Sequence, residues 1–312
     1  MSTAARLTGY ACALGLILAL GWGTGRVVGP GVVPTAATSA AITFAGHQDD
    51  ATGTAEAEGG ADSGEMGAPE EVDGLATAAG GYRLAVADPA FRPGTAGQLR
   101  FSVIGPDGHA VTAFARTPRD PDQVHVVVVR RDAAGFQRLD PTMDGDGTWH
   151  APLTLPAPGV WRAFVDMTPT GSLPLVLGAD LFAAGPFDPF TFPPSRVAEI
   201  GGFQLRVDGD LAPGTPSQVF VTVSRDGAGV TDLQPYLAAF GKLVLLRQGD
   251  LAYVAADSGD GTAPPPAPTD RAGPALAFTA DVPSSGTYRL FLQFRVADVM
   301  HTAEFTLPTR TS

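Results

Sequence analysis

The sequence predicts an all-β protein with two tandem antiparallel β-sandwich domains of the immunoglobulin-like type. Three observations predict this fold class. Short β-branched or alternating apolar segments recur along the chain, turns rich in Gly and Pro separate them, and no long segment has helical periodicity. One hairpin also occurs twice, which indicates a duplicated domain. The length of 312 residues is enough for about two domains.

The duplicated hairpin spans residues 123–141 in its first copy and 241–257 in its second. Four consecutive valines at 126–129 form an apolar run that is typical of a strand buried on both faces. A turn then leads into a second short strand. A constant offset of 117 residues pairs His125 with Lys242, Arg130 with Arg247, Phe136 with Tyr253, and Asp140 with Asp257.

The flanking segments of the two copies also correspond. Each copy has an alternating strand before the hairpin and an alternating aromatic strand after it, as expected for half-buried strands. These segments are 98–104 and 218–224 before the hairpins, and 158–165 and 285–292 after them. We therefore expect repeat one at residues 79–184 and repeat two at residues 198–309.

Two segments depart from this pattern. Residues 185–197 are rich in proline and contain three phenylalanines, so we expect a stiff linker whose aromatic rings pack on a neighbouring domain. The one helical signal lies at 231–240, where Thr231 or Asp232 could cap a short helix and Gly241 could end it.

The amino-terminal segment predicts a membrane anchor. Residues 7–25 carry no charge and lie between Arg6 and Arg26, and a helix of this length reaches about 28 Å, close to the ~30 Å core of a bilayer. A cleaved signal peptide is the alternative, but the nearest small-residue sites, around 36–41, lie well beyond the apolar run. We expect a cytoplasmic segment at 1–6, a single-pass anchor in the cell membrane at 7–27, and extracytoplasmic repeats.

Residues 28–78 predict a disordered acidic linker. Nine carboxylates and no Lys or Arg lie between residues 47 and 73, and the formal net charge of the chain is −12. Such an acidic, exported chain is a poor candidate for binding nucleic acid or anionic lipid surfaces. Its single cysteine, Cys12, lies in the predicted anchor, which excludes disulfides and thiolate metal ligands from the repeats.

No motif predicts an enzyme. The sequence lacks the Gly-x-Ser-x-Gly elbow, a phosphate-binding loop, a dinucleotide fingerprint and the His-Glu-x-x-His motif. Residues 140–148 contain Asp-Gly-Asp-Gly, as in a calcium-binding loop, but the first carboxylate and the final glutamate of such a loop are missing. We interpret this segment as a tight turn.

Several short phrases carry a resemblance to a known family. They are Gly135-Phe136-Gln137, Asp146-Gly147-Thr148-Trp149, Leu153-Thr154-Leu155-Pro156, the segment 230–237 and the segment 249–253. With the twin hairpins, they make the chain similar to actinobacterial membrane-anchored exported proteins with two β-sandwich repeats. Those proteins are loosely grouped with YtkA-like or heavy-metal-associated secreted proteins. The resemblance implies histidines in each hairpin that would suit copper or zinc.

This sequence departs from the histidine pattern of that family. His125 keeps the first histidine of repeat one, but Arg138 and Asp140 stand where a His-x-His pair is expected. In repeat two the corresponding residues are Lys242, Ala255 and Asp257. We expect that the chain has lost the metal, and that ion pairs of Arg138 with Asp140, and of Lys242 with Asp257, fill the vacated sites.

These observations predict a non-enzymatic, membrane-anchored extracytoplasmic binding or scaffold protein, with no cofactor and with a protein partner in the cell envelope. The alternative is an extracytoplasmic copper- or zinc-binding carrier or sensor that uses His125 with Asp140.

Overall fold

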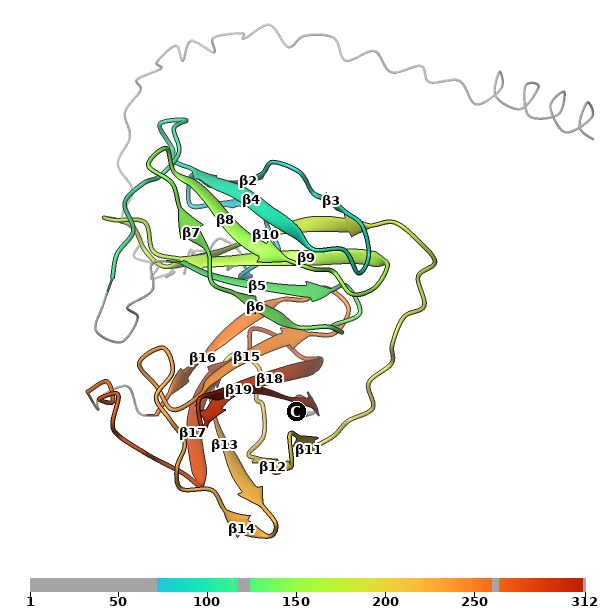
Figure 1. Cartoon of the computed structure of the whole chain (residues 1–312), viewed down its shortest axis with the longest axis vertical. Helices are drawn as coiled ribbons and strands as arrows, with labels where there is room; N and C mark the ends of the chain where they lie inside the picture. Colours follow the sequence, from blue (N-terminus) through green and yellow to red (C-terminus); the bar gives the residue numbers. More distant parts are fainter. Residues whose placement is uncertain (1–71, 117–123, 260–263, 311–312) are drawn as a thin grey trace, which may run out of the picture. The chain divides into compact units, whose positions relative to one another are not determined.

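The computed structural model describes residues 72–116, 124–259 and 264–310 (Figure 1). The predicted cytoplasmic segment 1–6, the predicted anchor 7–27 and the acidic linker up to residue 71 lie outside the described residues. Within the described part of the chain, no helix is long and apolar enough to cross a membrane. All its regular elements are β-strands, which confirms the predicted all-β fold class.

Repeat one is a sandwich of two five-stranded sheets. The first sheet has the order β1 (Ala78–Ala79), β2 (Tyr82–Val86), β4 (Gly97–Ile104), β8 (Thr148–Leu153) and β7 (Thr142–Met143). The second has the order β3 (Ala90–Phe91), β10 (Leu175–Ala183), β9 (Gly159–Met167), β5 (Val124–Arg130) and β6 (Gln137–Leu139). This arrangement of strands is immunoglobulin-like.

The ladders of repeat one are antiparallel with one exception. The short strand β3 pairs in parallel with the end of β10, through Phe182 opposite Ala90 and Ala183 opposite Phe91. The predicted antiparallel sandwich therefore holds for the main strands. Of the first four strands, β1, β2 and β4 belong to the first sheet and β3 belongs to the second.

Repeat two has the same plan, but its two sheets are joined. The strand order is β11 (Val197–Ile200), β12 (Phe203–Asp208), β13 (Pro216–Arg225), β17 (Ala275–Asp281), β16 (Tyr253–Ser258), β15 (Lys242–Arg247), β18 (Thr287–Val296) and β19 (Val299–Pro308), with β14 (Ala228–Gly229) paired to β13. Strand β16 makes the connection. Its first four residues pair with β15, and Asp257 and Ser258 pair with β17.

The corresponding strand of repeat one is interrupted. Strand β6 ends at Leu139 and β7 begins at Thr142, so Asp140 and Pro141 lie between the two sheets. Proline has no backbone N–H to donate to a ladder, which explains a break here. Asp140 and Asp257 thus both lie at the corner where the chain changes sheets.

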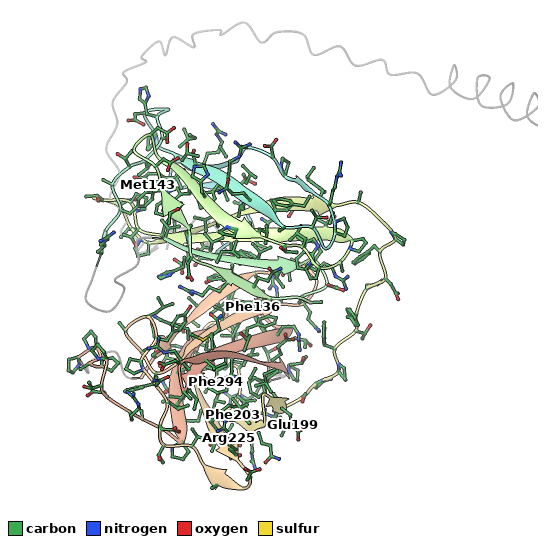
Figure 2. The ribbon with its side chains drawn as sticks, viewed as in Figure 1. Phe136, Met143, Glu199, Phe203, Arg225 and Phe294 are labelled. Atoms are coloured by element: carbon green, nitrogen blue, oxygen red, sulfur yellow. The ribbon has the colours of Figure 1, made fainter. Side chains whose placement is uncertain are left out.

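Each repeat has its own core, and the valine run is buried on both faces as predicted. Val126 and Val128 belong to the core of repeat one, whereas Val127 and Val129 belong to a separate cluster on the opposite face of β5. In the core of repeat two, Phe203 and Phe294 pack edge to face with ring centroids 5.5 Å apart (Figure 2).

The predicted helix at 231–240 is wrong. Leu233 bridges to Ala272 and Gln234 to Arg295, so the backbone of this segment is bound to neighbouring chain. Leu237 and Ala238 then adopt positive φ values of 50° and 57° in a tight turn. Tertiary backbone pairing has overridden a weak local helical preference.

Residues 72–78, predicted as the end of the disordered linker, instead lie against the folded part. The Gly74 N–H donates to Val176 O at 3.0 Å, and the Gly178 N–H donates to Ala76 O at 2.8 Å. The Tyr253 N–H, from repeat two, donates to Asp73 O at 3.0 Å. The prediction was based on the acidic side chains of this segment, whereas its order comes from backbone hydrogen bonds to both repeats.

Candidate functional site

A third hydrophobic cluster contains residues from both repeats. Its members lie on the outer faces of the duplicated hairpins and of the strands beside them: Val127, Val129, Ala133, Phe164, Val176, Val244, Leu246, Leu251, Tyr253 and Phe291, with Phe136 packed against them. Burial of this many apolar side chains stabilises the association of the repeats. The duplicated hairpin is therefore the element through which the two repeats pack.

The aromatic residues of this cluster form two reciprocal pairs. Phe136 stacks on Phe291 with ring centroids 4.4 Å apart, and Phe164 packs on Tyr253 at 5.2 Å. Phe136 corresponds to Tyr253 in the repeat, at the offset of 117, and Phe164 corresponds to Phe291, at an offset of 127. Each hairpin thus places one aromatic ring on a strand of the other repeat: Phe136 lies on β18, and Tyr253 lies on β9.

A buried arginine lies beside this cluster in each repeat. In repeat one, Arg162 on β9 is 6% exposed. Its Nη2 donates to the carbonyl oxygens of Gly74 at 2.8 Å and Leu75 at 2.7 Å, and its Nη1 donates to Asp180 Oδ1 at 2.7 Å. Gly178 makes this approach possible, because a Cβ there would lie 2.1 Å from Gly74 O.

The corresponding arginine of repeat two is Arg289 on β18, which is 4% exposed. Its guanidinium contacts the Glu304 carboxylate, and Nη1 donates to Thr306 Oγ1 at 2.9 Å. The guanidinium carbon also lies 3.7 Å from the centroid of the Phe192 ring, which belongs to the linker. Burial lowers the pKa of Arg289, and the Glu304 carboxylate opposes this change.

Four of the residues singled out in the sequence line one cleft between the repeats. This inter-repeat cleft has a volume of about 460 Å³ and is lined by His125 and Arg138 of repeat one and by Lys242 and Asp257 of repeat two, with Asp166 beside them. His125 and Asp166 are cross-strand neighbours. The sequence predicted two separate vacated sites, whereas the structure brings residues of both, other than Asp140, to one cleft. Its mixed charges suit hydrogen bonding to a small polar molecule.

Arg138 does not pair with Asp140 as predicted. Its Nη2 contacts His125 Nδ1, and its guanidinium carbon lies 5.9 Å from the centroid of the Tyr236 ring. Asp140 is exposed at the corner beyond β6 and does not line the cleft. Strand β6 ends before Asp140, where the chain passes to the other sheet, so the two residues are not side by side on one strand.

The aspartate-rich turn before β8 is a turn, as interpreted from the sequence. The Thr148 N–H donates to Asp146 Oδ1 at 2.9 Å, and His150 Nε2 lies 2.8 Å from Asp144 Oδ2. The hydrogen bond from the Thr148 N–H lowers the pKa of Asp146. Within residues 72–116, 124–259 and 264–310, no three His, Cys, Asp or Glu side chains are grouped so that they could hold a metal ion.

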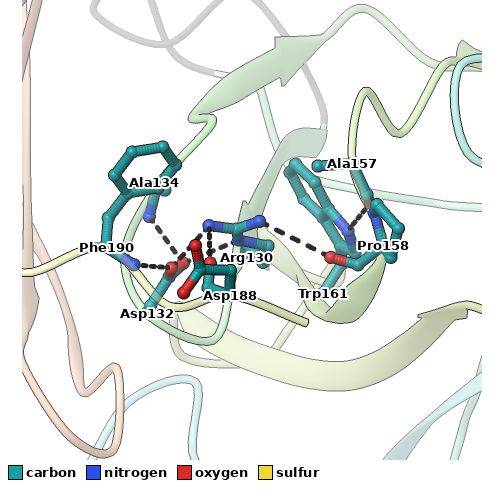
Figure 3. A network of polar contacts seen from close by, with 8 residues as sticks. All are labelled: Arg130, Asp132, Ala134, Ala157, Pro158, Trp161, Asp188 and Phe190. Atoms are coloured by element: carbon teal, nitrogen blue, oxygen red, sulfur yellow. Dashed lines mark hydrogen bonds and ion pairs between the residues drawn. The ribbon is translucent and has the colours of Figure 1, made fainter. Parts of the chain in front are cut away.

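The linker binds to both repeats through its phenylalanines, as predicted. In repeat one, Arg130 donates from Nε to Asp132 Oδ1 at 2.9 Å and from Nη2 to Asp132 Oδ2 at 2.6 Å (Figure 3). The Arg130 guanidinium carbon lies 5.2 Å from the centroid of the Phe187 ring and 5.3 Å from that of Phe190. The Phe190 N–H donates to Asp132 Oδ2 at 2.8 Å. Phe192 reaches Arg289 of repeat two.

The environment of Asp132 favours its charged form. Burial by itself would raise the pKa of Asp132, but the hydrogen bonds from Arg130 and from the Phe190 N–H, with the positive charge of Arg130, together lower it. The aspartate therefore stays ionised and holds the linker and the hairpin together.

Sequence reasoning missed the roles of Arg130, Arg162 and Arg289. The sequence did contain a sign of these roles, because arginine is repeated at the corresponding positions of the two repeats. Arg130 corresponds to Arg247, and Arg162 corresponds to Arg289. The oxygen atoms around each guanidinium could not be predicted, since they come from segments that are distant in the sequence.

Comparison with protein families matches residues 198–311 to a domain of unknown function, DUF8832. The match covers the second repeat and does not include the first. Comparison of the chain with curated proteins gave no match.

Among solved structures, the Escherichia coli adhesin FdeC aligns over 74% of this chain and 64% of its own, with 15% identity and a TM-score of 0.23. InvD of Yersinia pseudotuberculosis aligns over 73% of this chain and 57% of its own, with 12% identity and a TM-score of 0.24. This chain therefore spans less than two thirds of both structures. The fold assignment rests on the strand order and register described above.

Proposed function

We propose that the chain is a non-enzymatic binding or scaffold protein of the cell envelope, anchored in the membrane by residues 7–27 with both repeats on the extracytoplasmic side. The observation that carries this proposal is the cluster shared by the two repeats. It holds two immunoglobulin-like domains together through reciprocal aromatic pairs. A two-domain unit of this kind presents surfaces at a fixed spacing, which is what a scaffold requires.

The linker supports the same proposal. Phe187 and Phe190 contact Arg130 of repeat one, and Phe192 contacts Arg289 of repeat two. The connection between the repeats is thus itself bound to both of them. The acidic composition of the chain and the absence of catalytic sequence motifs are consistent with a binding role.

The location can be tested by cysteine labelling in intact cells. Leu173 is 82% exposed, so a Leu173→Cys variant of the full chain, with Cys12→Ser, offers one accessible thiol. We expect a membrane-impermeant maleimide to label it without cell lysis. Leu155→Cys is the matched control, since Leu155 is 0% exposed and should react only after denaturation. Labelling of Leu173→Cys only after lysis would contradict the proposed location.

The binding role can be tested by crosslinking in the same cells. A photo-crosslinking residue at Leu173 or at Phe190, which is 64% exposed, should give a discrete adduct with an envelope protein from at least one of the two positions. A chain that stays uncrosslinked at every exposed position tested would argue against a scaffold.

The copper or zinc carrier is the second candidate. It would need cation ligands in the inter-repeat cleft, where His125 Nδ1 contacts the Arg138 guanidinium and Lys242 adds a further positive charge. Asp140, its proposed second ligand, does not line the cleft. This arrangement supports the carrier less well than the scaffold.

A further inference from the structure

The hairpin arginine of each repeat is part of the same three-residue arrangement. In repeat one it consists of Arg130, Asp132 and Gly159, called here the Arg130 site. In repeat two it consists of Arg247, Asp250 and Gly286, called the Arg247 site. The Arg247 Nε donates to Asp250 Oδ1 at 3.0 Å and its Nη2 contacts Asp250 Oδ2, which matches the two contacts between Arg130 and Asp132.

The backbone around the two sites matches as well. The Ala134 N–H donates to Asp132 Oδ1 at 3.3 Å, and the Ala252 N–H donates to Asp250 Oδ1 at 3.2 Å. A Cβ on Gly159 would lie 3.2 Å from Arg130 Cδ, and a Cβ on Gly286 would lie 3.1 Å from Arg247 Cδ. Each site thus has a planar, paired guanidinium next to a glycine, which carries no side chain.

In repeat one this arrangement binds an extended segment of the linker. The Phe187 ring covers the glycine, since a Cβ on Gly159 would lie 2.9 Å from it. The Arg130 guanidinium contacts the rings of both Phe187 and Phe190. Asp132 Oδ2 accepts the Phe190 N–H at 2.8 Å, and Arg130 Nη2 donates to Asp188 O at 3.4 Å. Two rings and the backbone between them are therefore recognised together.

The two sites differ in exposure. The side chains of Arg130 and Asp132 are 5% and 7% exposed, whereas those of Arg247 and Asp250 are 19% and 40% exposed. Around Gly286, the described residues place only Arg247 atoms within 4 Å of a Cβ position. The Arg247 site therefore presents, at the surface, the recognition groups that the linker covers in repeat one.

We propose that the Arg247 site binds an extended peptide segment that carries two phenylalanines three residues apart, supplied by a partner protein of the cell envelope. The first ring packs on Gly286, both rings contact the Arg247 guanidinium, and the N–H of the second phenylalanine donates to Asp250. This inference rests on the proposed binding function and gives it a partner chemistry. Residues 187–190 of this chain are held at the Arg130 site, and we assign the Arg247 site to a separate polypeptide that carries the same pair of rings.

The ionisation of Asp250 supports this assignment. The hydrogen bond from Arg247 lowers the pKa of Asp250, with smaller contributions from the Ala252 N–H and the charge of Arg247, while burial opposes them. The carboxylate is therefore charged at neutral pH and is a strong acceptor for a backbone N–H.

The test uses the purified full chain and a fluorescein-labelled synthetic peptide with the sequence of residues 185–194. Fluorescence anisotropy should show saturable binding. The chain's own linker is tethered at the Arg130 site, where its effective concentration is on the order of millimolar, so the added peptide reports on the Arg247 site. A peptide with alanine in place of Phe187 and Phe190 should bind at least about ten-fold more weakly.

Two variants of the site should weaken binding by the same factor: Arg247→Met, which removes the guanidinium, and Asp250→Asn, which keeps the shape of the side chain. The matched control is the exposed pair of Arg206 and Asp208 on β12, in which Arg206 Nε donates to Asp208 Oδ1 at 3.0 Å. Arg206→Met and Asp208→Asn should leave binding unchanged. A thermal unfolding curve for each variant confirms that it is folded.

Three results would overturn the inference. They are the absence of saturable binding below millimolar peptide, equal affinity for the alanine peptide, and equal loss of binding in the Arg206 and Arg247 variants. Each of these would leave the location and crosslinking results of the proposed function standing, because those experiments do not use the Arg247 site.

Discussion

Arg162 and Arg289 occupy corresponding places in the two repeats, but they take their oxygen acceptors from different sources. In repeat one, Gly178 leaves room for the carbonyl of Gly74, which belongs to the segment that enters the fold. In repeat two, the residue that corresponds to Gly178 is Glu304, and its carboxylate contacts Arg289. A buried guanidinium needs hydrogen-bond acceptors. Backbone carbonyls provide them for Arg162, and the Glu304 carboxylate provides one for Arg289.

The same contrast holds for Arg130 and Arg247. The Arg130 site is covered by Phe187 and Phe190, whereas the Arg247 site is partly exposed. In both comparisons the strands and the arginines correspond, and the difference lies in the segments that join the sandwich from outside. The duplicated strands therefore provide a common framework, and the added segments make each copy distinct.

The largest expected effect would come from breaking the reciprocal aromatic pairs. Phe164 and Phe291 are both 0% exposed, so Phe164→Ala and Phe291→Ala should each lower the free energy of unfolding by about 3–5 kcal/mol. Urea unfolding followed by tryptophan fluorescence and by circular dichroism would measure the loss. If the pairs are equivalent, the two variants should agree within about 1 kcal/mol.

A matched control for those variants is Phe220→Ala. Phe220 lies on β13, away from the shared cluster, and is 45% exposed. Its removal should cost less than about 1 kcal/mol, since little buried area is lost. A Phe220→Ala cost equal to that of Phe291→Ala would show that the shared cluster contributes nothing special.

The next prediction tests whether Gly178 is what allows Arg162, unlike Arg289, to bind backbone carbonyls. Gly178→Ala adds a methyl group 2.1 Å from Gly74 O, so the entering segment must shift away from Arg162. We expect a loss of about 1–3 kcal/mol in the free energy of unfolding, together with faster proteolysis near residue 74. Gly145→Ala is the control, because a Cβ there would meet nothing within 4 Å. Equal stability of the two variants would contradict the close approach.

The strand framework followed from the sequence because its signals are local. The alternation along β4 and β13, the valine run of β5 and the glycine turns each report on the neighbours of a single segment. The offset of 117 residues also predicted which side chains correspond. Those signals were sufficient for the all-β class and for the two repeats.

The partners of each side chain could not be predicted in the same way. His125 and Lys242 line one cleft only because the two hairpins pack on each other, and nothing in either hairpin alone encodes that proximity. The failed pairing of Arg138 with Asp140 has a local cause, since strand β6 ends between them and the chain passes to the other sheet. The failed helix at 231–240 was overridden by bridges to residues that are distant in sequence.

A smaller effect is expected on the pH dependence of stability, and it differs between the two hairpin carboxylates, Asp132 and Asp250. The pKa values of Asp132 and Asp250 are lowered in the folded protein, so each contributes stability above the unfolded pKa of about 3.9 and loses it as the pH falls. Asp132→Asn should be less stable than the unmodified chain at pH 6, and the difference should narrow towards pH 2–3. The stability difference between Asp250→Asn and the unmodified chain should change less with pH, because the Asp250 carboxylate is more exposed.

Urea unfolding midpoints measured between pH 2 and pH 6 would give both stability differences. A difference that stays constant with pH would contradict the lowered pKa of that aspartate.

The smallest expected effect is that of cupric and zinc ions on thermal unfolding of the full chain. Because His125 Nδ1 contacts Arg138 and Lys242 lines the same cleft, we expect no shift of the transition with either ion. A site filled at a hundred times its Kd would add about 2.7 kcal/mol and raise the transition by several degrees, so the measurement is sensitive enough. A saturable upward shift that is lost in His125→Ala and kept in His109→Ala, a variant of an exposed turn, would restore the metal carrier. It would also show that the guanidinium of Arg138 moves away from the imidazole when a cation binds.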